Sequence, residues 1–336
     1  MSMLKQLIKS LIAYTLYYSG VIALLKRRRL DNRAVVLMYH RVVPHELMGS
    51  IHSTSGIVTE AGLFSRHLVW LKEEFRVLSV NELAELFREQ REIPSGSCLL
   101  TFDDGWRDNF EHAKPALEAQ AVPATIFLPY HYIENDIVFW QEELLARLEA
   151  LVHSDAQADR TYLHEITGIE GDADKAQLRA FISGLKQLSY EEIDGLLDNL
   201  RQRQAGSHVD LSNDRYLDWT QVHAMSQSVI NFGSHALSHR ILTQIDPGEA
   251  ASEIQDSKRL LDEHIEGGVQ SIAYPNGNSS REVERLTEQA GFKLGFVTRR
   301  GYVSKQSNPL SLPRFNIHSN NSKSKPMLMC LLLDIF

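Results

Sequence analysis

Cysteine is scarce in this chain of 336 residues, which contains only Cys98 and Cys330. Two cysteines cannot form the dense disulfide framework that supports small secreted domains. Cys98 lies in the apolar run 98–102 and is predicted to be a buried strand residue. The scarcity fits a reducing compartment without requiring one. The chain also lacks an internal repeat of about 20–50 residues, which excludes solenoid and propeller architectures.

A long uncharged run is also lacking. Near the N-terminus, Leu11–Leu25 has fifteen residues without a formal charge, whereas a helix needs about 20 to cross a bilayer. Lys26–Arg29 follows in place of a small-residue cleavage site, which argues against a removable signal peptide. Three interpretations stay open: an interfacial helix or short membrane anchor, which we prefer, a buried or partner-binding helix, and an uncleaved signal anchor.

Basic residues are in the minority except at the N-terminus. Residues 1–33 carry seven basic side chains and one acidic one, and the remainder carries 28 basic and 42 acidic. The acidic body argues against a nucleic-acid partner, because phosphate contacts need clustered Lys and Arg. The basic end favours a membrane surface as the partner of residues 1–30. The positive-inside bias favours the cytoplasmic face, and a periplasmic or extracellular position stays open.

Short β-rich runs alternate with helical patterns along the chain. The predicted strands are Ala34–Tyr39, Cys98–Phe102, Ala124–Leu128, Val229–Gly233, Ser271–Tyr274 and Leu294–Thr298. The predicted helices include Glu60–Glu74, Val80–Glu89, Phe110–Gln120, Pro247–His264 and Ser280–Ala290. This alternation implies βαβ units and a parallel sheet that is either open or closed into a barrel.

One stretch breaks the alternation. From about residue 134 to 218 only helical patterns occur, at Trp140–His153, Lys175–Leu188 and Tyr190–Arg203. This connection is several-fold longer than a normal crossover, so we predict a helical insertion. It is either a lid or substrate platform, or a decoration without function. The predicted division is a basic, hydrophobic helix over 1–30, a barrel over 31–320 and an apolar tail over 321–336. That tail is a closing helix or a second membrane contact.

Polar side chains follow the predicted strands at the points where the strands end. They are His40, Asp103, Asp104, His235 with His239 four residues later, and Asn276. In parallel α/β folds the carboxyl ends of the strands lie on one face, where active sites are assembled. We therefore expect these side chains to converge.

The residue types at these positions indicate a metal site. Asp103 and Asp104 repel each other, and a nearby cation relieves the cost of burying them. The alternative for one of them is a helix N-cap, although Asp108 can take that task instead. His235 and His239 share one face if their segment is helical. Two imidazoles and one carboxylate leave a coordination position open, as catalytic sites do. The set suits Zn²⁺ and does not exclude Co²⁺, Ni²⁺, Mn²⁺ or Fe²⁺.

Two motifs carry a family resemblance. The sequences Thr101-Phe102-Asp103-Asp104-Gly105 and His235-Ala236-Leu237-Ser238-His239 resemble the first two motifs of the polysaccharide deacetylases (carbohydrate esterase family 4, the NodB homology domain). Met38-Tyr39-His40-Arg41-Val42 resembles the branch that includes exopolysaccharide deacetylases. The resemblance covers about 35–314 without the insertion. It implies a distorted (β/α)7-type barrel and a hydrolase of carbon–nitrogen amide bonds, which removes N-acetyl groups from amino-sugar residues.

The resemblance also implies roles by motif position. Asp104, His235 and His239 would hold one divalent ion, preferably Zn²⁺, which polarises the amide carbonyl and acidifies water. Asp103 would take a proton from the attacking water, and an acid would protonate the departing amine. The candidates for sugar contacts are Tyr274, Asn276 and Trp106. An aromatic residue beside an apolar run is more often part of the core.

The sequence departs from the family pattern in two places. The third motif usually has an arginine two residues before its proline, where this chain has Ala273. We predict that Arg314 supplies this charge to Asp103, the alternative being a surface or helix-capping arginine. The usual late Leu-x-His motif is not clear. We therefore prefer His40 as the general acid over His318, and a structural role for both is the third possibility.

Other functions fit part of the pattern. Metal-dependent phosphatases also place aspartates before glycine at strand ends, but no phosphate-binding lysine or glycine-rich loop stands in an obvious place here. A catalytically inactive glycan- or lipid-binding relative is supported only by the altered third motif. Within the deacetylase interpretation, the substrate stays open between an N-acetylated glycan, including peptidoglycan, and a lipid-linked saccharide.

Overall fold

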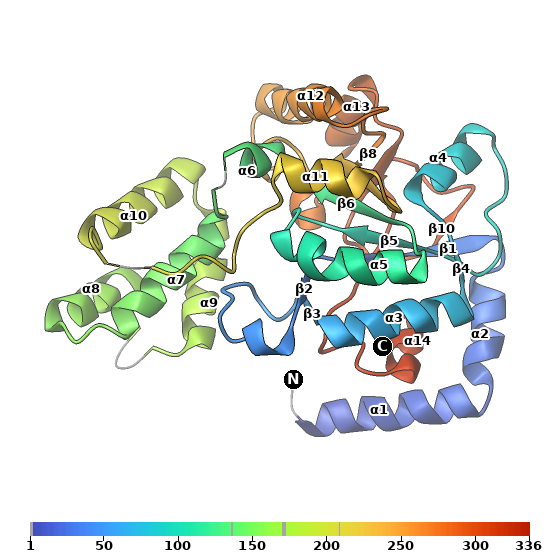
Figure 1. Ribbon diagram of the computed structural model, residues 1–336, viewed down its shortest axis with the longest axis horizontal. Coiled ribbons are helices and arrows are strands. Elements are labelled where there is room, and N and C mark those ends of the chain that lie inside the picture. The colour runs from blue at the N-terminus through green and yellow to red at the C-terminus, as the bar shows by residue number, and fades with distance from the viewer. Residues whose placement is uncertain (1–2, 136, 170–172, 208) are drawn as a thin grey trace. The chain divides into compact units, whose positions relative to one another are not determined.

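The computed structural model describes residues 3–135, 137–169, 173–207 and 209–336. The chain divides into two compact units, each continuous in space but not in sequence. The first unit comprises Met1–His45, Ser55–Asn135 and Tyr216–Phe336, and the second comprises Glu46–Thr54 and Asp136–Arg215. Figure 1 follows the chain through both units.

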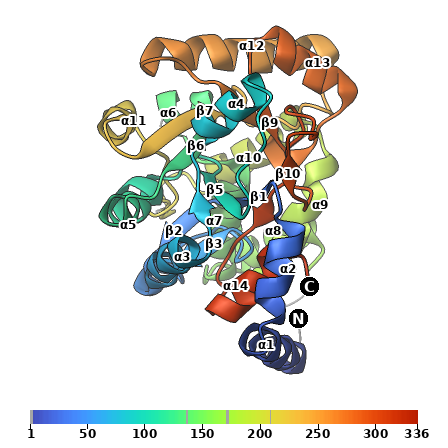
Figure 2. The same ribbon diagram turned by 90° about the vertical axis from the view of Figure 1, so that its right-hand side faces the viewer.

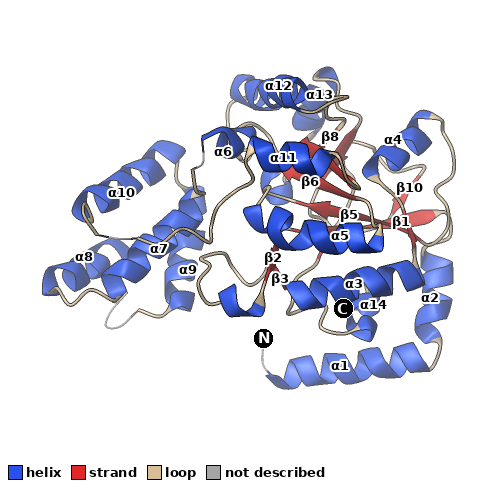
Figure 3. Cartoon of the chain, viewed as in Figure 1, coloured by secondary structure: helices blue, strands red, loops and turns tan. Residues whose placement is uncertain are grey.

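The first unit is built around a curled, mainly parallel sheet (Figure 3). Its hydrogen-bonded order is β10-β1-β5-β6-β7-β8-β9, with β11 beside β1 and β4 beside β5. The strands are β1 (Arg33–Tyr39), β4 (Arg76–Val77), β5 (Ser97–Phe102), β6 (Ala124–Leu128), β7 (Ile230–Ser234), β8 (Ser271–Ala273), β9 (Leu294–Phe296), β10 (Val303–Ser304) and β11 (Phe315–Asn316). Two further strands, β2 (Arg41–Val43) and β3 (Val58–Glu60), form a small parallel sheet.

The segment 312–316 joins the two ends of the curled sheet. Leu312 forms a parallel bridge to Phe296 of β9, and three residues later Phe315 pairs with Leu37 of β1. The predicted distorted barrel of parallel strands is therefore confirmed. Every predicted strand is observed close to its predicted bounds, because buried runs between turn residues leave few alternatives.

Helices cover the outside of this barrel. They are α3 (Ala61–Glu74), α4 (Val80–Arg88), α5 (Lys114–Gln120), α6 (Tyr130–Asn135), α11 (Trp219–Ser226), α12 (Pro247–His264) and α13 (Arg281–Gln289). The predicted helix at 110–120 begins with a π-helical turn, Asn109–Ala113. Asp108 precedes that turn but forms no side-chain cap, so its predicted capping role is wrong. Its carboxylate accepts hydrogen bonds from Arg41 and from the Val42 amide instead.

The barrel core ends in a polar layer at the carboxyl ends of the strands. Val36 of β1, Leu99 of β5 and Phe127 of β6 belong to one buried cluster that also includes Leu83 of α4. Residues two apart in a strand point to the same side, so the side chains after Leu99 on this face belong to residues 101 and 103. Strand β5 thus changes from apolar to polar where it reaches the mouth of the barrel.

The N-terminal region forms two helices where one hydrophobic helix was predicted. Helix α1 (Met3–Tyr18) and helix α2 (Val21–Arg29) are separated by Gly20, whose φ of 81° is left-handed. The two helices bend by 82° at this break. No single helix in the described residues is long and apolar enough to span a membrane, although the bent pair passes by length and composition.

The C-terminal tail forms helix α14 (Lys325–Leu332), which packs against α1. Leu328, Leu331 and Leu332 are buried in this packing. The tail is thus a helix buried in the first unit, as the closing-helix alternative expects, and the second membrane contact stays a prediction. Cys330 is also buried in α14, and Cys98 is buried in β5 as predicted.

The second unit is helical and has its own core. Its helices are α7 (Trp140–Val152), α8 (Gln157–Thr167), α9 (Lys175–Gly184) and α10 (Tyr190–Arg203). Leu144, Leu148, Leu178 and Leu197 pack together at its centre. Helix α8 was not predicted, and residues 136, 170–172 and 208 of the predicted insertion lie outside the described residues.

Candidate active site

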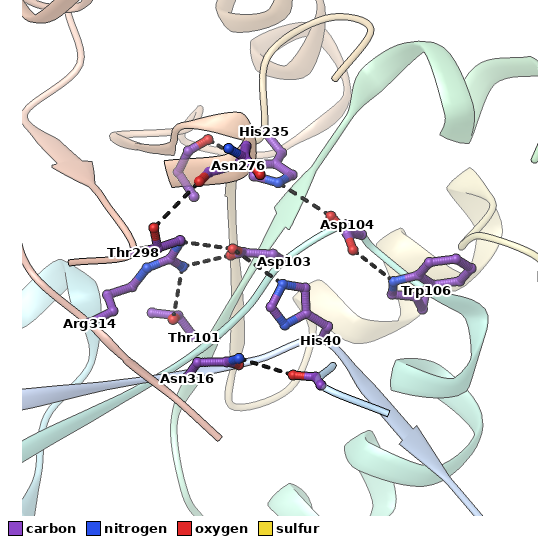
Figure 4. Close-up of polar contacts among 12 residues, drawn as sticks. His40, Thr101, Asp103, Asp104, Trp106, His235, Asn276, Thr298, Arg314 and Asn316 are labelled. Atoms are coloured by element: carbon purple, nitrogen blue, oxygen red, sulfur yellow. Dashed lines mark hydrogen bonds and ion pairs between the residues drawn. The ribbon is translucent and has the colours of Figure 1, made fainter. Parts of the chain in front are cut away.

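The predicted polar residues converge at the carboxyl ends of the barrel strands (Figure 4). His40 follows β1, Asp103 and Asp104 follow β5, and His235 follows β7. The backbone ladders continue into the site, since the amide of Asp103 donates to the Tyr39 carbonyl over 3.0 Å. The sheet register therefore places side chains from distant parts of the sequence side by side.

Asp104, His235 and His239 form a compact set of possible metal ligands. Oδ1 of Asp104 lies 3.3 Å from Nε2 of His235 and 3.4 Å from Nε2 of His239. One ligand atom from each residue lies within 4.8 Å of the other two. Bonds of about 2.1 Å at tetrahedral angles separate neighbouring ligand atoms by about 3.4 Å. The spacing therefore fits a single divalent ion.

Hydrogen bonds orient two of these ligands. Nδ1 of His235 donates to the Ala273 carbonyl over 2.6 Å, so in the neutral ring Nε2 presents a lone pair. Nε1 of Trp106 donates to Oδ2 of Asp104 over 3.0 Å, which leaves Oδ1 facing the histidines. A carboxylate oxygen and an imidazole lone pair repel each other at this distance unless a cation or proton lies between them. The donor set therefore fits a metal ion.

Electrostatics at this set favour positive charge. Burial alone lowers the pKa of His235, but the Asp104 and Asp103 carboxylates outweigh it and raise that pKa. Burial raises the pKa of Asp104, but hydrogen bonds from His235 and His239 hold that pKa well below its ordinary value. The carboxylates therefore remain ionised and attract a cation.

The segment 235–239 is a turn and not a helix, so the condition for a shared helical face is not met. Ala236 and His239 have left-handed backbones, with φ of 63° and 61°. Glu253 of α12 fixes the turn, because its Oε2 accepts hydrogen bonds from the amides of Leu237 at 3.0 Å and Ser238 at 2.9 Å. The two imidazoles meet because this carboxylate organises the backbone between them.

A sharp turn separates the roles of the two aspartates. Asp104 has a φ of 73° and Gly105 a φ of 65°, so the chain leaves β5 abruptly. A Cβ atom at position 105 would lie 2.8 Å from Cδ2 of Leu128. Glycine has no Cβ and therefore avoids this close contact. Left-handed backbones at non-glycine residues cost of order 1 kcal/mol and often mark functional sites. Figure 4 shows that the turn directs Asp103 toward Arg314 and Asp104 toward His235.

Arg314 forms an ion pair with Asp103, as we predicted because the third motif lacks its usual arginine. Its Nη1 and Nη2 donate to Oδ1 and Oδ2 of Asp103 over 2.6 Å and 2.8 Å. Nη1 also contacts Oγ1 of Thr101 at 3.3 Å, and Nε donates to the Val297 carbonyl at 3.2 Å. Arg314 is 0% exposed, so it is neither a surface nor a helix-capping residue. Its part in turnover stays a prediction.

The Arg314 charge determines the state of Asp103. Burial alone raises the pKa of Asp103, but Arg314, followed by His235 and His40, outweighs it and lowers that pKa. Asp103 is therefore ionised at neutral pH. Because both its oxygens are held by the guanidinium, the plane of the carboxylate is also fixed.

His40 lies beside this ion pair. Its Nε2 is 3.9 Å from Oδ2 of Asp103. Its Nδ1 is buried and has no hydrogen-bond partner in the part of the chain that the structure describes. Burial lowers the pKa of His40, and the opposing effects of Asp104 and Asp103 only partly compensate.

The second candidate acid, His318, is a neighbour of the first. Met38 of β1 pairs in parallel with Asn316 of β11. If this register is continued for two more residues, His318 comes to lie opposite His40. Burial lowers the pKa of His318, and the charge of His40 lowers it further. His40 lies within 3.9 Å of Asp103, which supports our preference for it, and its role as the acid stays a prediction.

Only one of the predicted sugar-binding residues is accessible. Asn276 follows β8, has an exposed side chain, and has a left-handed φ of 58°. Tyr274 and Trp106 are fully buried, so their predicted sugar contacts are wrong in this conformation. The Tyr274 hydroxyl donates to the Leu310 carbonyl over 2.9 Å. Both aromatic residues satisfy their polar groups inside the protein, as core aromatic residues do.

Sequence reasoning missed the residues that support the site. Glu253 was not singled out, although a carboxylate in the buried stripe of α12 is an unusual feature. Arg41 belongs to the motif 38–42 and Asp108 was considered only as a helix cap, so their ion pair, with Nε and Oδ2 2.8 Å apart, was not foreseen. The Arg41 guanidinium also covers the Trp106 ring at 4.2 Å, so the pair supports the residue that holds Asp104.

Comparison with known proteins decides the family. A family model described as polysaccharide deacetylase matches residues 90–295, more than half of the chain and including both aspartates and both histidines of the site. This chain belongs to the polysaccharide deacetylase family. It is accordingly a hydrolase that acts on the amide carbon–nitrogen bonds of acetylated sugars. The match ends before Arg314 and begins after His40, so it carries no information about either.

Individual relatives support this family and the fold. The deacetylase is 23% identical over 291 residues to the Bacillus subtilis protein "Putative polysaccharide deacetylase YxkH", covering 86% of this chain and 73% of that one. The Streptococcus pyogenes deacetylase PplD matches with a TM-score of 0.57 at 21% identity, over 89% of this chain and 98% of its own. IcaB from Ammonifex degensii matches with a TM-score of 0.58 at 17% identity, over 90% and 97%. At these identities the solved structures show a shared fold.

Proposed function

We propose that this deacetylase removes N-acetyl groups from amino-sugar residues of a poly- or oligosaccharide with the help of one divalent metal ion. The observation that carries the proposal is the opposite use of two adjacent carboxylates. Asp104 faces two imidazoles, while Asp103 faces a guanidinium. This difference in surroundings supports a role as metal ligand for Asp104 and as base for Asp103.

Asp104, His235 and His239 would hold the ion. When bound, it supplies a Lewis acid that polarises the amide carbonyl and lowers the pKa of water. The mixed nitrogen and oxygen donors favour Zn²⁺ and also suit Co²⁺, Ni²⁺, Mn²⁺ and Fe²⁺. These residues come from two strand ends, and hydrogen bonds orient two of them: Trp106 orients Asp104, and the Ala273 carbonyl orients His235.

Asp103 would accept the proton of the attacking water. Its lowered pKa makes it a weak base, so it accepts a proton readily only from a water molecule whose own pKa has been lowered. Arg314 keeps the carboxylate ionised and fixes its plane. One oxygen can take the proton while the guanidinium retains the other.

His40 would donate a proton to the departing amine nitrogen. This nitrogen must be protonated before the carbon–nitrogen bond breaks, because an amide anion is a very poor leaving group. Nε2 of His40 lies 3.9 Å from Oδ2 of Asp103, and Figure 4 shows the His40 ring beside that carboxylate. Asn276 at the mouth would contact the sugar through its exposed amide.

The test combines metal analysis with amine release from an oligomer of N-acetylglucosamine. We expect about one divalent ion per chain and one amine per acetate released. Asp103→Asn should retain the ion and lose about 10²–10⁴-fold in turnover, whereas His239→Ala should lose both. Asp256→Asn, on an exposed aspartate of α12, is the matched control.

Three outcomes separate the alternatives. Bound glycan without amine release, in a metal-loaded protein, would indicate a binding protein that has lost catalysis. Release of phosphate from p-nitrophenyl phosphate with no amine release would indicate a phosphatase. Undiminished amine release by Asp103→Asn would rule out the proposed base.

A further inference from the structure

Helix α1 exposes its apolar side chains to solvent. Leu7 is 61% exposed, Leu11 69% and Tyr18 77%. The other large exposed apolar residues of this helix are Ile8, Ile12 and Tyr14. Residues 7, 11, 14 and 18 are spaced to form one stripe along a helix, and residues 8 and 12 widen it on one side. We call these six residues the α1 stripe.

The opposite face of α1, which packs on the protein, is mostly small or polar, and Leu16 on this face is only half-buried. Ala13 is completely buried. The Tyr17 hydroxyl donates to Oε1 of Glu74 over 3.1 Å, and the Lys9 ammonium lies 5.0 Å from the centre of the Phe336 ring. A surface helix of a soluble protein normally turns its apolar face inward. Helix α1 instead turns its apolar face outward, so burial in the protein core does not explain why this helix is rich in apolar residues.

The position of α1 leaves the stripe accessible. Figures 1 and 2 both show α1 at the edge of the first unit, beside α14. Lys26 of α2 and Lys325 of α14 both pair with Glu74 of α3, at 2.7 Å each. These ion pairs attach α2 and α14 to α3 of the first unit. Because α1 packs against α14 and its Tyr17 also bonds to Glu74, α1 is a fixed part of the surface of this unit.

The charges around the stripe favour one kind of partner. Residues 1–30 contain no acidic side chain. Lys5 at one end of α1, and Arg27 and Arg28 on α2, are exposed. An apolar helical face bordered by lysine and arginine is typical of a helix that lies in the interface of an anionic membrane. The net acidic remainder of the chain is repelled by such a surface, which leaves this end to face it.

We propose that α1 docks this deacetylase on an anionic lipid surface, lying in the plane of the interface with its stripe among the acyl chains. The 82° bend at Gly20 directs α2 away from α1, so the two helices do not form one straight span. The basic residues beyond the stripe meet the lipid headgroups. This inference does not depend on the proposed chemistry.

The first experiment measures flotation of the full chain with vesicles. Vesicles of phosphatidylglycerol should bind the protein, and vesicles of phosphatidylcholine should bind it about tenfold less. Leu7→Glu combined with Leu11→Glu should reduce binding to phosphatidylglycerol by about tenfold or more. The control is Val69→Glu. Val69 is likewise an exposed apolar helical residue, with 40% exposure, but it belongs to α3 and not to the α1 stripe. Circular dichroism verifies that each variant is folded.

Two results would overturn the proposal. One is equal binding of the double variant and the Val69→Glu control to phosphatidylglycerol. The other is that the unmodified chain does not bind vesicles and sediments as a dimer without lipid, whereas the double variant sediments as a monomer. The α1 stripe would then be an interface between two copies of the chain.

A second experiment tests the in-plane orientation. In Leu11→Trp the additional indole should be quenched most strongly by lipids brominated near the headgroup end of the acyl chain. The unmodified protein, which contains four tryptophans, provides the background signal. Strongest quenching by lipids brominated near the bilayer centre would contradict an in-plane helix and indicate insertion across the membrane.

Discussion

Arg314 and Asp103 are 211 residues apart in the chain and form a two-pronged ion pair inside the mouth of the barrel, with N–O distances of 2.6 Å and 2.8 Å. Arg314 precedes β11 and Asp103 follows β5, and both of these strands pair with β1. The usual third-motif arginine is replaced by Ala273, whose carbonyl orients His235 instead. The charge of the missing arginine is thus supplied from a different strand end.

Replacing Arg314 by alanine should lower turnover far more than metal content. The substitution removes the charge that lowers the pKa of Asp103, so that pKa rises and the acidic limb of the pH–rate profile moves to higher pH. Breaking a buried pair also costs about 3–5 kcal/mol of stability. Arg314→Lys should be intermediate, because it cannot bind both oxygens.

The control for Arg314 is Arg285→Ala, which breaks an exposed ion pair with Glu282. Solvent and salt screen an exposed pair so strongly that it contributes little to stability, so this variant should behave like the unmodified enzyme. Unchanged turnover in a folded, metal-loaded Arg314→Ala would end the proposed role.

The basic limb of the pH–rate profile should disappear in His40→Ala. A general acid must be protonated, so activity falls as the pH rises through its pKa. Burial lowers the pKa of His40, which moves this limb to lower pH than an unperturbed histidine would give. His318→Ala should keep the limb, because the proposed acid is still present and the charges that act on its pKa are those of Asp104, Asp103, Arg314 and His235. A basic limb that persists in His40→Ala and vanishes in His318→Ala would reverse the assignment.

Glu253→Ala should weaken metal binding without removing a ligand. Its carboxylate holds the amides of Leu237 and Ser238, and the two histidines flank these residues. Residues that support metal ligands typically contribute about 10–100-fold in metal affinity. Competition with a chelator measures the loss, and Glu263→Gln on the exposed face of α12 is the control. Equal metal affinity in the two variants would show that the turn holds its shape without Glu253.

The second unit should lose stability in mild alkali because of His52. Its Nδ1 donates to Oδ2 of Asp214 over 2.6 Å, and Nε2 lies 3.4 Å from Glu149. Burial lowers the pKa of His52, but these carboxylates outweigh it and raise that pKa to about 9. The stabilisation is therefore complete below about pH 6.5 and is lost as the pH rises through 9.

Hydrogen exchange of the amides of α7 measures this effect. Protection should decrease between pH 6.5 and 9 in the unmodified chain, after correction for the intrinsic rate, and should not change with pH in His52→Gln. His164→Gln, an exposed histidine of the same unit, should behave like the unmodified chain. A pH dependence that persists in His52→Gln would place its origin elsewhere.

The strands and the principal site residues could be predicted from the sequence because both depend on local patterns. Buried apolar runs specify strands, and polar residues at their ends must meet at one face of a parallel barrel. The placement of Trp106 and Tyr274 depends on which groups surround them, and a single run of sequence does not contain that information. The same reason explains why the Glu253 contact was missed and why Asp108 was assigned to a cap. The cytoplasmic side, inferred from basic residues, stays a prediction.

The most direct test of the account is an anomalous-diffraction map of the crystallised enzyme, recorded above and below the absorption edge of the metal found by elemental analysis. We expect a single peak between Oδ1 of Asp104, Nε2 of His235 and Nε2 of His239, and no peak there in catalytically inactive His239→Ala. An active, fully loaded enzyme whose only peak lies away from these three atoms would contradict the proposed site.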